Sequence, residues 1–314
     1  MTTAFFSHAD CARHEMGTWH PESPQRLQAI QDQLISSRID SLLEHREAPL
    51  AQMRDIVRVH TPASIARIIE NSPSAASAGE QAYFALDADT CLNAHSWRAA
   101  LRAAGAAVAA TDAVIDGEVA NAFCSIRPPG HHATPGEAMG FCLVNNIAVA
   151  AKYALEKRGL QRVAVVDFDV HHGNGTEAAF AGDPRVLMVS FFQHPFYPYS
   201  GTEHPAANMH NVPVPAHSYG DLVRKIVLDT WLPALHLHQP EMIFISAGFD
   251  GHREDDMGQM GLVEADYAWM TQQIMRIASQ YANGRIVSCL EGGYNLSALG
   301  RSVVAHVKVM AHLD

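Results

Sequence analysis

The sequence predicts an α/β fold, a three-layer α/β/α sandwich with a central, mostly parallel sheet. Five short apolar runs are rich in β-branched residues and do not alternate with polar positions, which is typical of parallel strands covered on both faces. Helical patterns lie between these runs, and strands that alternate with helices indicate a parallel sheet. The chain has 314 residues and is 48% hydrophobic, so we expect a single domain over residues 1–314.

The predicted elements follow one another in a regular order. The first helix is expected after Pro24, where Leu27, Ile30 and Leu34 share one face. Further helices are expected over residues 95–115, 145–157, 219–235, 265–281 and 296–312. Strands are expected over residues 122–125, 163–166, 186–190, 242–246 and 286–290. Residues 192–214, which contain several Pro, His and Tyr, are expected to form a long irregular segment at the rim of a site.

Composition and charge argue against several classes of function. Lys and Arg number 22 against 33 Asp and Glu, a net charge of −11, which disfavours binding to the phosphate backbone of nucleic acids. Five scattered cysteines without a C-x-x-C pair indicate a reducing compartment. We expect no secretory signal and no membrane span, because the Ala-rich stretch 99–110 is short and interrupted by Arg102. A cytoplasmic protein is therefore expected, with neither nucleic acid nor membrane as partner and with homo-oligomerisation left open.

Four polar motifs each follow a predicted strand. They occupy residues 127–132, 167–175, 248–250 and 291–294. In open α/β sheets, ligands bind outside the carboxyl ends of the strands. We therefore expect the four motifs to form one shared cleft.

Two of these motifs supply the ligands for a metal ion. Asp169 and His171 are spaced i, i+2, so on extended chain both side chains point the same way. Asp250 supplies a third ligand from another strand. Two carboxylates and one imidazole around an open position favour one Zn²⁺ per chain, with Fe²⁺, Co²⁺ or Mn²⁺ chemically admissible. The alternative is a hydrogen-bonded polar cluster at the strand ends. A single Asp-x-His pair without a third ligand would favour this alternative over a metal site.

The remaining motifs supply acid–base groups. His131 and His132 follow a rigid Pro-Pro-Gly turn, and a neutral imidazole near an activated water is a natural general base. Asp167 and Asn174 are candidates to orient these rings. Tyr294 follows two glycines, and its phenol could stabilise a developing oxyanion. The alternatives are a structural role for His131 and a rim position for Tyr294.

Aromatic residues in two further segments could wall a narrow apolar channel. Gly140 and Phe141 lie in one segment, and Tyr197 lies in the irregular segment. The alternative is that Phe141 is a core residue and Tyr197 a surface one.

Taken in order, these motifs resemble those of the histone deacetylase and acetylpolyamine amidohydrolase family, in its class II-like bacterial branch. The resemblance runs from residues 20–27 through 127–132, 140–146, 167–175 and 247–250 to 291–295, which is nearly the whole chain. It implies the arginase-deacetylase fold, and it implies that the zinc ligands are Asp169, His171 and Asp250.

The resemblance also implies the catalytic roles. His132 is expected to be the general base, His131 its electrostatic partner, and Asp167 the group that orients His131. Tyr294 is expected to stabilise the transition state. Asn174 stands where some branches of the family have Asp. Because an amide stabilises an imidazolium less than a carboxylate does, we expect His132 to remain neutral at working pH.

A set of substrate contacts is implied as well: Gly140, Phe141, Tyr197, Met257, Arg26 and Gly292. The family usually has Phe where Tyr197 stands, so the channel is expected to be more polar here. Arg26 resembles an arginine that lines an inner acetate cavity. Met257 falls where lysine deacetylases carry Met or Leu and one polyamine-specific branch carries Glu, so it favours acyl-lysine. The family also binds a structural K⁺, here expected near Asp167, Asp169, His171, Ser190 and Phe191.

We therefore expect a zinc-dependent amidohydrolase that removes acetyl or other acyl groups from the Nε of lysine in proteins or peptides. One alternative is an acetylpolyamine amidohydrolase. A binuclear manganese ureohydrolase shares the fold but needs bridging carboxylates, which His172-Gly173-Asn174 does not supply. The last alternative is a non-catalytic protein that binds acylated amines.

Overall fold

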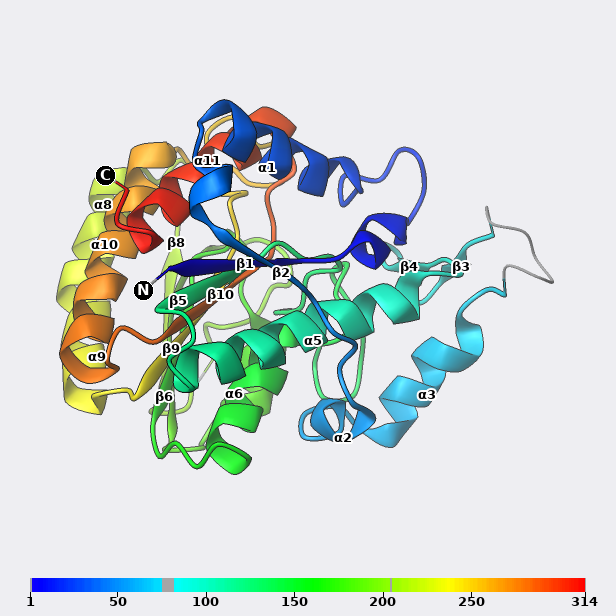
Figure 1. Ribbon diagram of the computed structural model, residues 1–314, viewed down its shortest axis with the longest axis horizontal. Coiled ribbons are helices and arrows are strands. Elements are labelled where there is room, and N and C mark those ends of the chain that lie inside the picture. The colour runs from blue at the N-terminus through cyan, green and yellow to red at the C-terminus, as the bar shows by residue number, and fades with distance from the viewer. Residues whose placement is uncertain (1, 75–81, 204, 314) are drawn as a thin grey trace.

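The computed structural model describes residues 2–74, 82–203 and 205–313, and its centre is an eight-stranded sheet (Figure 1). All neighbouring strands of this sheet pair in parallel, in the order β2-β1-β5-β10-β9-β6-β7-β8. The strands are β1 (Thr3–Ser7), β2 (Glu44–Glu47), β5 (Asn121–Cys124), β6 (Val163–Asp167), β7 (Val186–Gln193), β8 (Met209–Val214), β9 (Met242–Ala247) and β10 (Ile286–Leu290). Strands β3 (Phe84–Ala85) and β4 (Cys91–Leu92) form a separate antiparallel pair.

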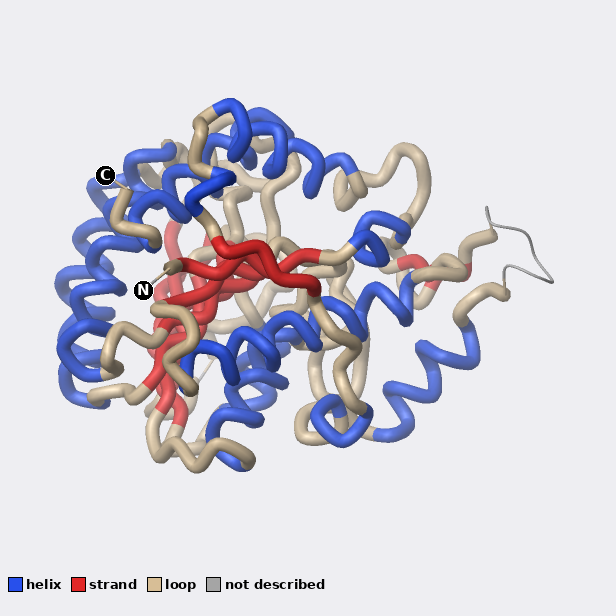
Figure 2. Tube along the Cα trace, viewed as in Figure 1, coloured by secondary structure: helices blue, strands red, loops and turns tan. Residues whose placement is uncertain are grey.

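Helices enclose the sheet (Figure 2). The α-helices are α1 (Gln25–Ser36), α2 (Met53–Ile56), α3 (Pro62–Asn71), α5 (Ser96–Ile115), α6 (Asn146–Glu156), α7 (Asn174–Phe180), α8 (Gly220–Ile226), α9 (Leu232–His238), α10 (Glu264–Tyr281) and α11 (Leu296–Met310). Two short 3₁₀ helices, η1 (Ala9–Arg13) and η2 (Asp40–Leu42), precede and follow α1, and a π-helical turn, η3 (Val227–Trp231), joins α8 to α9. Within the described residues, no helix combines the length and the apolar character needed to cross a membrane.

The sheet separates two apolar cores. Residues of α5 and α6 pack on one face, and residues of α1, α10 and α11 pack on the other. Along β6, Val163 and Val165 belong to the first core, whereas Ala164 and Val166 belong to the second. Because successive side chains of a strand point to opposite faces, a strand covered on both faces must be apolar throughout. This confirms the predicted three-layer sandwich.

The central strands and long helices lie where the sequence predicts them, but three strands of the large sheet and the separate β3–β4 pair were not predicted. β1, β2 and β8 lie toward the edges of the sheet, and β2 and β8 are only partly buried. The expected irregular segment 192–214 is therefore irregular only between β7 and β8. The helix predicted over 219–235 is interrupted by the η3 turn, just before Pro233, whose missing N–H prevents a regular helical hydrogen bond.

The strand order places the polar motifs side by side. β5, β10, β9 and β6 are consecutive neighbours in the sheet, and each is followed by one of the four motifs. All four strands run in the same direction, so their carboxyl ends meet at one edge.

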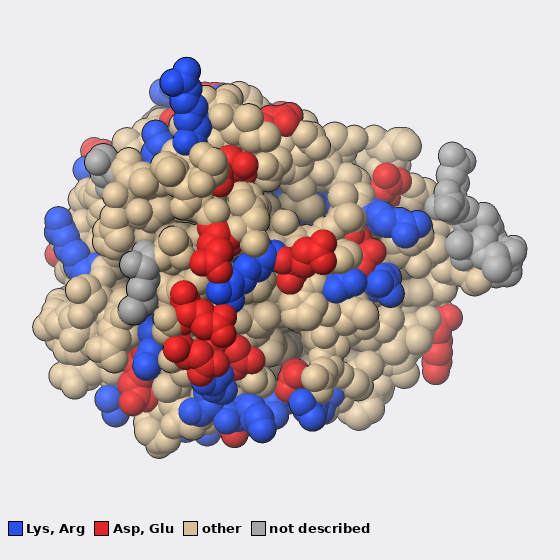
Figure 3. All heavy atoms as spheres, viewed as in Figure 1, with Lys and Arg blue, Asp and Glu red and all other residues tan. Residues whose placement is uncertain are grey.

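Acidic and basic side chains are interspersed on the face shown in Figure 3, where no broad basic patch is seen.

Candidate active site

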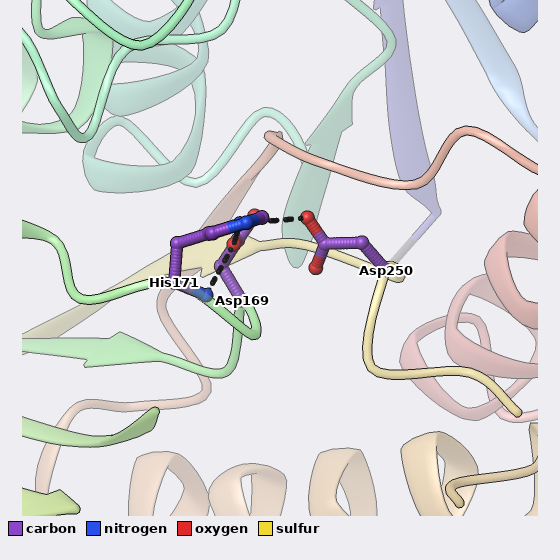
Figure 4. A group of neighbouring side chains, drawn as sticks. All are labelled: Asp169, His171 and Asp250. Atoms are coloured by element: carbon purple, nitrogen blue, oxygen red, sulfur yellow. Dashed lines mark hydrogen bonds and ion pairs between the residues drawn. The ribbon is translucent and has the colours of Figure 1, made fainter. Parts of the chain in front are cut away.

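Three side chains converge beyond the carboxyl ends of β6 and β9. Asp169 and His171 follow β6, Asp250 follows β9, and the three point toward one another (Figure 4). His171 Nδ1 lies 3.0 Å from Asp169 Oδ1 and 3.2 Å from Asp250 Oδ2. One possible ligand atom from each residue lies within 4.8 Å of the others, and all three residues are buried. The structure thus brings together the metal ligands that the sequence predicts.

Backbone N–H groups hold the two carboxylates in place. Asp169 Oδ1 accepts the N–H of His171 at 2.9 Å, and Asp169 Oδ2 accepts the N–H of Gly292 at 2.9 Å. Asp250 Oδ1 accepts the N–H of Val170 at 3.0 Å. A Cβ at position 292 would lie 2.0 Å from Asp250 Oδ2, so only glycine allows the backbone to approach the carboxylates this closely.

The buried charge of this group fits a divalent cation. Burial raises the pKa of Asp250, and the neighbouring Asp169 carboxylate raises it further. Within the described part of the chain, Asp250 Oδ2 accepts no well-oriented hydrogen bond, although His171 Nδ1 lies near it. A divalent cation would neutralise both carboxylates and take up this lone pair, and one imidazole with two carboxylates is a ligand set that zinc accepts.

His132 is arranged as a neutral base. Its Nδ1 lies 2.8 Å from Asn174 Oδ1. Asn174 Nδ2 faces Met139 Sδ at 3.3 Å, so the amide oxygen is the atom that accepts the His132 Nδ1–H, and Nε2 keeps a free lone pair. Burial lowers the pKa of His132, and the neighbouring His131 imidazole lowers it further.

The surroundings of His131 favour the protonated form of its imidazole. Its Nδ1 lies 3.0 Å from Asp167 Oδ2, and its Nε2 lies 3.8 Å from Asp169 Oδ2. Burial acts to lower the pKa of His131, but the charges of Asp169 and Asp167 together raise it well above its usual range. The rings of His131 and His132 are 4.0 Å apart between centroids. Asp167 therefore favours the protonated form of His131, whereas the surroundings of His132 favour the neutral form.

A cavity of about 240 Å³ opens beside this group. His132, His171 and Tyr294 all line it. Four of the predicted substrate contacts line it as well: Gly140, Phe141, Tyr197 and Met257. The site is therefore open on one side, as a catalytic metal centre requires.

The backbone of Phe141 is strained. Its φ is 67°, a value that residues with a Cβ seldom adopt. Thr90 Oγ1 accepts the N–H of Phe141 at 3.1 Å, and the ring of His20 packs edge-on against the Phe141 ring with centroids 4.6 Å apart. Such strain persists where the surroundings over-determine the conformation, and here the result is a fixed aromatic wall of the cavity.

Tyr294 lines the same cavity. It follows β10 and the two glycines of the fourth motif. Burial raises the pKa of the Tyr294 phenol well above its usual range, so the O–H remains protonated and can donate a hydrogen bond. The ring is packed between the Arg26 guanidinium, 4.9 Å from its centroid, and the ring of Phe141, 5.8 Å away.

Arg26 and Gly292 are not among the described residues that line this cavity. Arg26 is fully buried, and its guanidinium donates to Glu22 Oε1 at 3.0 Å, to the carbonyl oxygen of Gly293 at 2.6 Å and to that of Glu291. These contacts hold Arg26 against the Tyr294 loop, and its predicted place at an inner acetate cavity stays a prediction. Gly292 lies against the carboxylates of Asp169 and Asp250 and donates its N–H to Asp169.

The predicted K⁺ site stays a prediction. Asp167 and Ser190 are paired across β6 and β7, so part of the expected ligand set lies together. The carbonyl oxygen of Ser190 accepts the indole N–H of Trp231 at 3.3 Å, and Ser190 Oγ donates to Asn211 Oδ1 at 3.0 Å.

Three cavity residues were not predicted: Asp89, Phe196 and Asp256. Phe196 directly precedes Tyr197, so the predicted rim segment was the signal for it. Asp256 directly precedes Met257 in the same way. Asp89 lies between β3 and β4, far along the chain from every strand-end motif, and its sequence surroundings carry no comparable signal.

Comparisons with known proteins show the family of this chain. Residues 20–310 match the family model of the histone deacetylase domain. The chain is 35% identical to a histone deacetylase-like amidohydrolase of Pseudomonas aeruginosa, over 93% of this chain and 82% of that protein. It is 35% identical to a probable deacetylase of Archaeoglobus fulgidus, over 100% of this chain and 88% of that protein. It spans 20% of the length of type-2 histone deacetylase 2 of Dictyostelium discoideum, with 32% identity.

A solved structure gives the same answer for the fold. The crystal structure of the HDA15 HD domain superposes with a TM-score of 0.90 and 32% sequence identity, over 99% of this chain and 90% of that one. The family model covers most of the chain, and the group of Asp169, His171 and Asp250 lies with the cavity at the carboxyl edge of the sheet. The chain therefore belongs to the histone deacetylase family, as a hydrolase of the deacetylase type.

Proposed function

We propose that this protein is a zinc-dependent amidohydrolase that removes acetyl or another acyl group from the Nε of lysine in proteins or peptides. The observation that carries the proposal is the single cavity lined by His132, His171 and Tyr294. A base, a metal ligand and a phenol donor facing one space are the groups that amide hydrolysis needs.

Each side chain has a defined part in this reaction. Asp169, His171 and Asp250 would hold the zinc ion, which when bound supplies the Lewis acidity that polarises a carbonyl and acidifies a water. His132 Nε2 takes the proton of the attacking water, because its Nδ1–H is committed to Asn174. The Tyr294 O–H donates to the oxyanion as it develops.

The other groups complete the reaction. His131, protonated beside Asp167, stabilises the negative charge that builds up near it. The proton taken up by His132 then passes to the nitrogen of the leaving amine. Phe141, Tyr197 and Met257 line the cavity with largely apolar surface, which suits the aliphatic stem of an acylated lysine.

A metal and product assay tests the proposal. We expect chelation to abolish release of acetate from an acetyl-lysine peptide, and one equivalent of Zn²⁺ per chain to restore it. Two ions per chain with hydrolysis of a guanidine substrate would instead support the ureohydrolase. Tight binding of the acetylated peptide without any released acetate would support the non-catalytic alternative.

One observation favours acetylated polyamines as a second candidate substrate class. Asp89 and Asp256 both line the cavity, and negative charge there would attract a free ammonium group beyond the acylated nitrogen. Comparing kcat/KM for acetylspermidine with that for an uncharged acetyl-lysine peptide discriminates the two classes. A preference for the polyamine that disappears in Asp89→Asn and Asp256→Asn variants would assign it to these charges.

A further inference from the structure

Asp255 is a buried carboxylate that has no part in the chemistry proposed above. It lies in the turn between β9 and α10, downstream of Asp250, and is 5% exposed. Its side chain does not line the cavity, and it is not one of the three clustered metal-binding residues. Burial of a carboxylate is costly unless its oxygens are well hydrogen-bonded, so its contacts reveal what it does.

Both oxygens of Asp255 accept backbone N–H groups from residues that wall the cavity. Oδ2 accepts the N–H of Tyr294 at 2.6 Å and that of Asn295 at 2.8 Å. Oδ1 accepts the N–H of Met257 at 3.0 Å. Tyr294 and Met257 both line the cavity, so one carboxylate is hydrogen-bonded to the backbone of two cavity-lining residues.

The Tyr294 loop needs such an anchor. The residue before Tyr294 is Gly293, with a φ of 116°, and a glycine pair leaves the backbone many alternative conformations. Arg26 restrains the carbonyl oxygens of this loop, whereas Asp255 is the partner of the Tyr294 N–H. A displacement of the Tyr294 backbone would move the phenol oxygen away from the reacting carbonyl.

A second contact joins the same two segments. Asn295 Nδ2 donates to the carbonyl oxygen of Glu254 at 2.9 Å, while Asn295 Oδ1 accepts the N–H of Ala298 and caps α11. The turn that carries Asp255 is therefore tied to the first turn of a long helix. This gives the carboxylate a rigid base from which to fix the loop.

We propose that Asp255 is a positioning residue that sets the place of the Tyr294 phenol and of the Met257 wall at the same time. The effect of Asp255 on turnover rests on the proposed function, because Asp255 acts through Tyr294. The effect of Asp255 on the position of Tyr294 does not depend on the proposed function. The two parts can be tested separately.

The kinetic test compares two substitutions of Asp255 in the zinc-loaded protein. Asp255→Ala removes all three acceptor contacts, and we expect kcat to fall by about 10- to 100-fold, the size expected for a misplaced catalytic group. Asp255→Asn keeps one oxygen, which best serves the adjacent N–H groups of Tyr294 and Asn295 and leaves the Met257 N–H facing an NH₂ group. We expect this variant to keep kcat within about fivefold and to raise KM instead.

Glu241→Ala is the matched control. Glu241 Oε2 also accepts two backbone N–H groups, those of Gln161 at 2.5 Å and Arg162 at 3.1 Å. Glu241 precedes β9 and therefore lies at the amino end of the strand, opposite the site. We expect its loss to reduce thermal stability while leaving kcat within twofold of wild type.

Two further readouts separate positioning from a general loss of structure. In a Tyr294→Phe background, we expect Asp255→Ala to lower kcat by less than about threefold more, because the phenol that it positions is already gone. In protein labelled with 3-fluorotyrosine, the ¹⁹F resonance of Tyr294, assigned by its loss in Tyr294→Phe, is expected to shift in Asp255→Ala and to stay unchanged in Glu241→Ala.

The outcomes are distinguishable. An unshifted Tyr294 resonance in Asp255→Ala, or kcat effects that multiply fully in the double variant, would overturn the inference. A wild-type protein that hydrolyses none of the acylated amines would refute the proposed function, while the fluorine measurement would still decide whether Asp255 positions Tyr294.

Discussion

Replacing Tyr294 by Phe isolates the contribution of one hydroxyl group to the reaction. The ring contacts with Arg26, at 4.9 Å, and with Phe141, at 5.8 Å between centroids, do not involve the phenol oxygen. A phenylalanine ring can keep both contacts, so the substitution is expected to leave the fold and the cavity walls unchanged. What it removes is the O–H that burial keeps protonated, since burial raises the pKa of this phenol well above its usual range.

The size of the effect follows from the role of that hydroxyl. Loss of one preorganised donor to an oxyanion costs about 3–4 kcal/mol of transition-state stabilisation, which is on the order of 10²–10³ in kcat. A donor that acts only in the transition state changes kcat and leaves KM nearly unchanged. We therefore expect a fall in kcat of that order with KM within about threefold.

The assay is steady-state release of acetate from an acetyl-lysine peptide by the zinc-loaded protein. Tyr281→Phe serves as control, because its hydroxyl contacts His236 Nδ1 at 2.9 Å on α9, away from the cavity. That variant is expected to retain wild-type kcat. A Tyr294→Phe variant with kcat within threefold of wild type would remove Tyr294 from the mechanism and refute the reasoning.

Three further predictions concern buried charge. Burial lowers the pKa of His60 to about 4, so on acidification the unfolded chain takes up this proton before the folded protein does. The free energy of unfolding therefore falls as pH drops from about 6.5 to 4, by about 2 kcal/mol between pH 7 and pH 5. Urea titrations of His60→Gln should show a shallower pH dependence of the free energy of unfolding. The fully buried carboxylate of Glu22 contacts Arg127 Nε at 2.5 Å and Arg26 Nη1 at 3.0 Å. Glu22→Ala leaves both buried guanidiniums without their carboxylate and should lower the free energy of unfolding by about 3–5 kcal/mol, read from denaturant midpoints. Asn174→Asp places a carboxylate against His132 Nδ1 and should raise the acidic limb of the kcat/KM–pH profile by about one to three units; an unmoved limb contradicts the role of the amide.

The central part of the fold could be predicted from the chain because its physical constraints are local. A strand covered on both faces, such as β6 or β9, must be a short, continuous apolar run. The edge strands escape this rule. β2 alternates between partly buried and exposed residues, and β8 contains Pro213 and three half-buried positions. Neither has an apolar run that could be recognised without knowing its neighbour.

The residues of the candidate site, like the strands, could be predicted from the sequence only in part. Asp169 and His171 could be paired from their spacing alone, because both lie just beyond one strand. Asp89 and Asp255 could not be recognised. The first reaches the cavity from the segment between β3 and β4, and the second acts through backbone N–H groups of residues 257, 294 and 295. Arg26 donates to the carbonyl oxygens of Glu291 and Gly293, contacts that its place in the sequence does not indicate.

The sequence by itself determined the chemistry of this protein, since the side chains able to bind a metal, accept a proton and donate to an oxyanion are encoded in short motifs beyond successive strands. Only the tertiary structure decided how those groups face one another and what stands behind them. The order of strands in the sheet brings distant segments together, and the contacts that result depend on distances through space, which no spacing along the chain encodes.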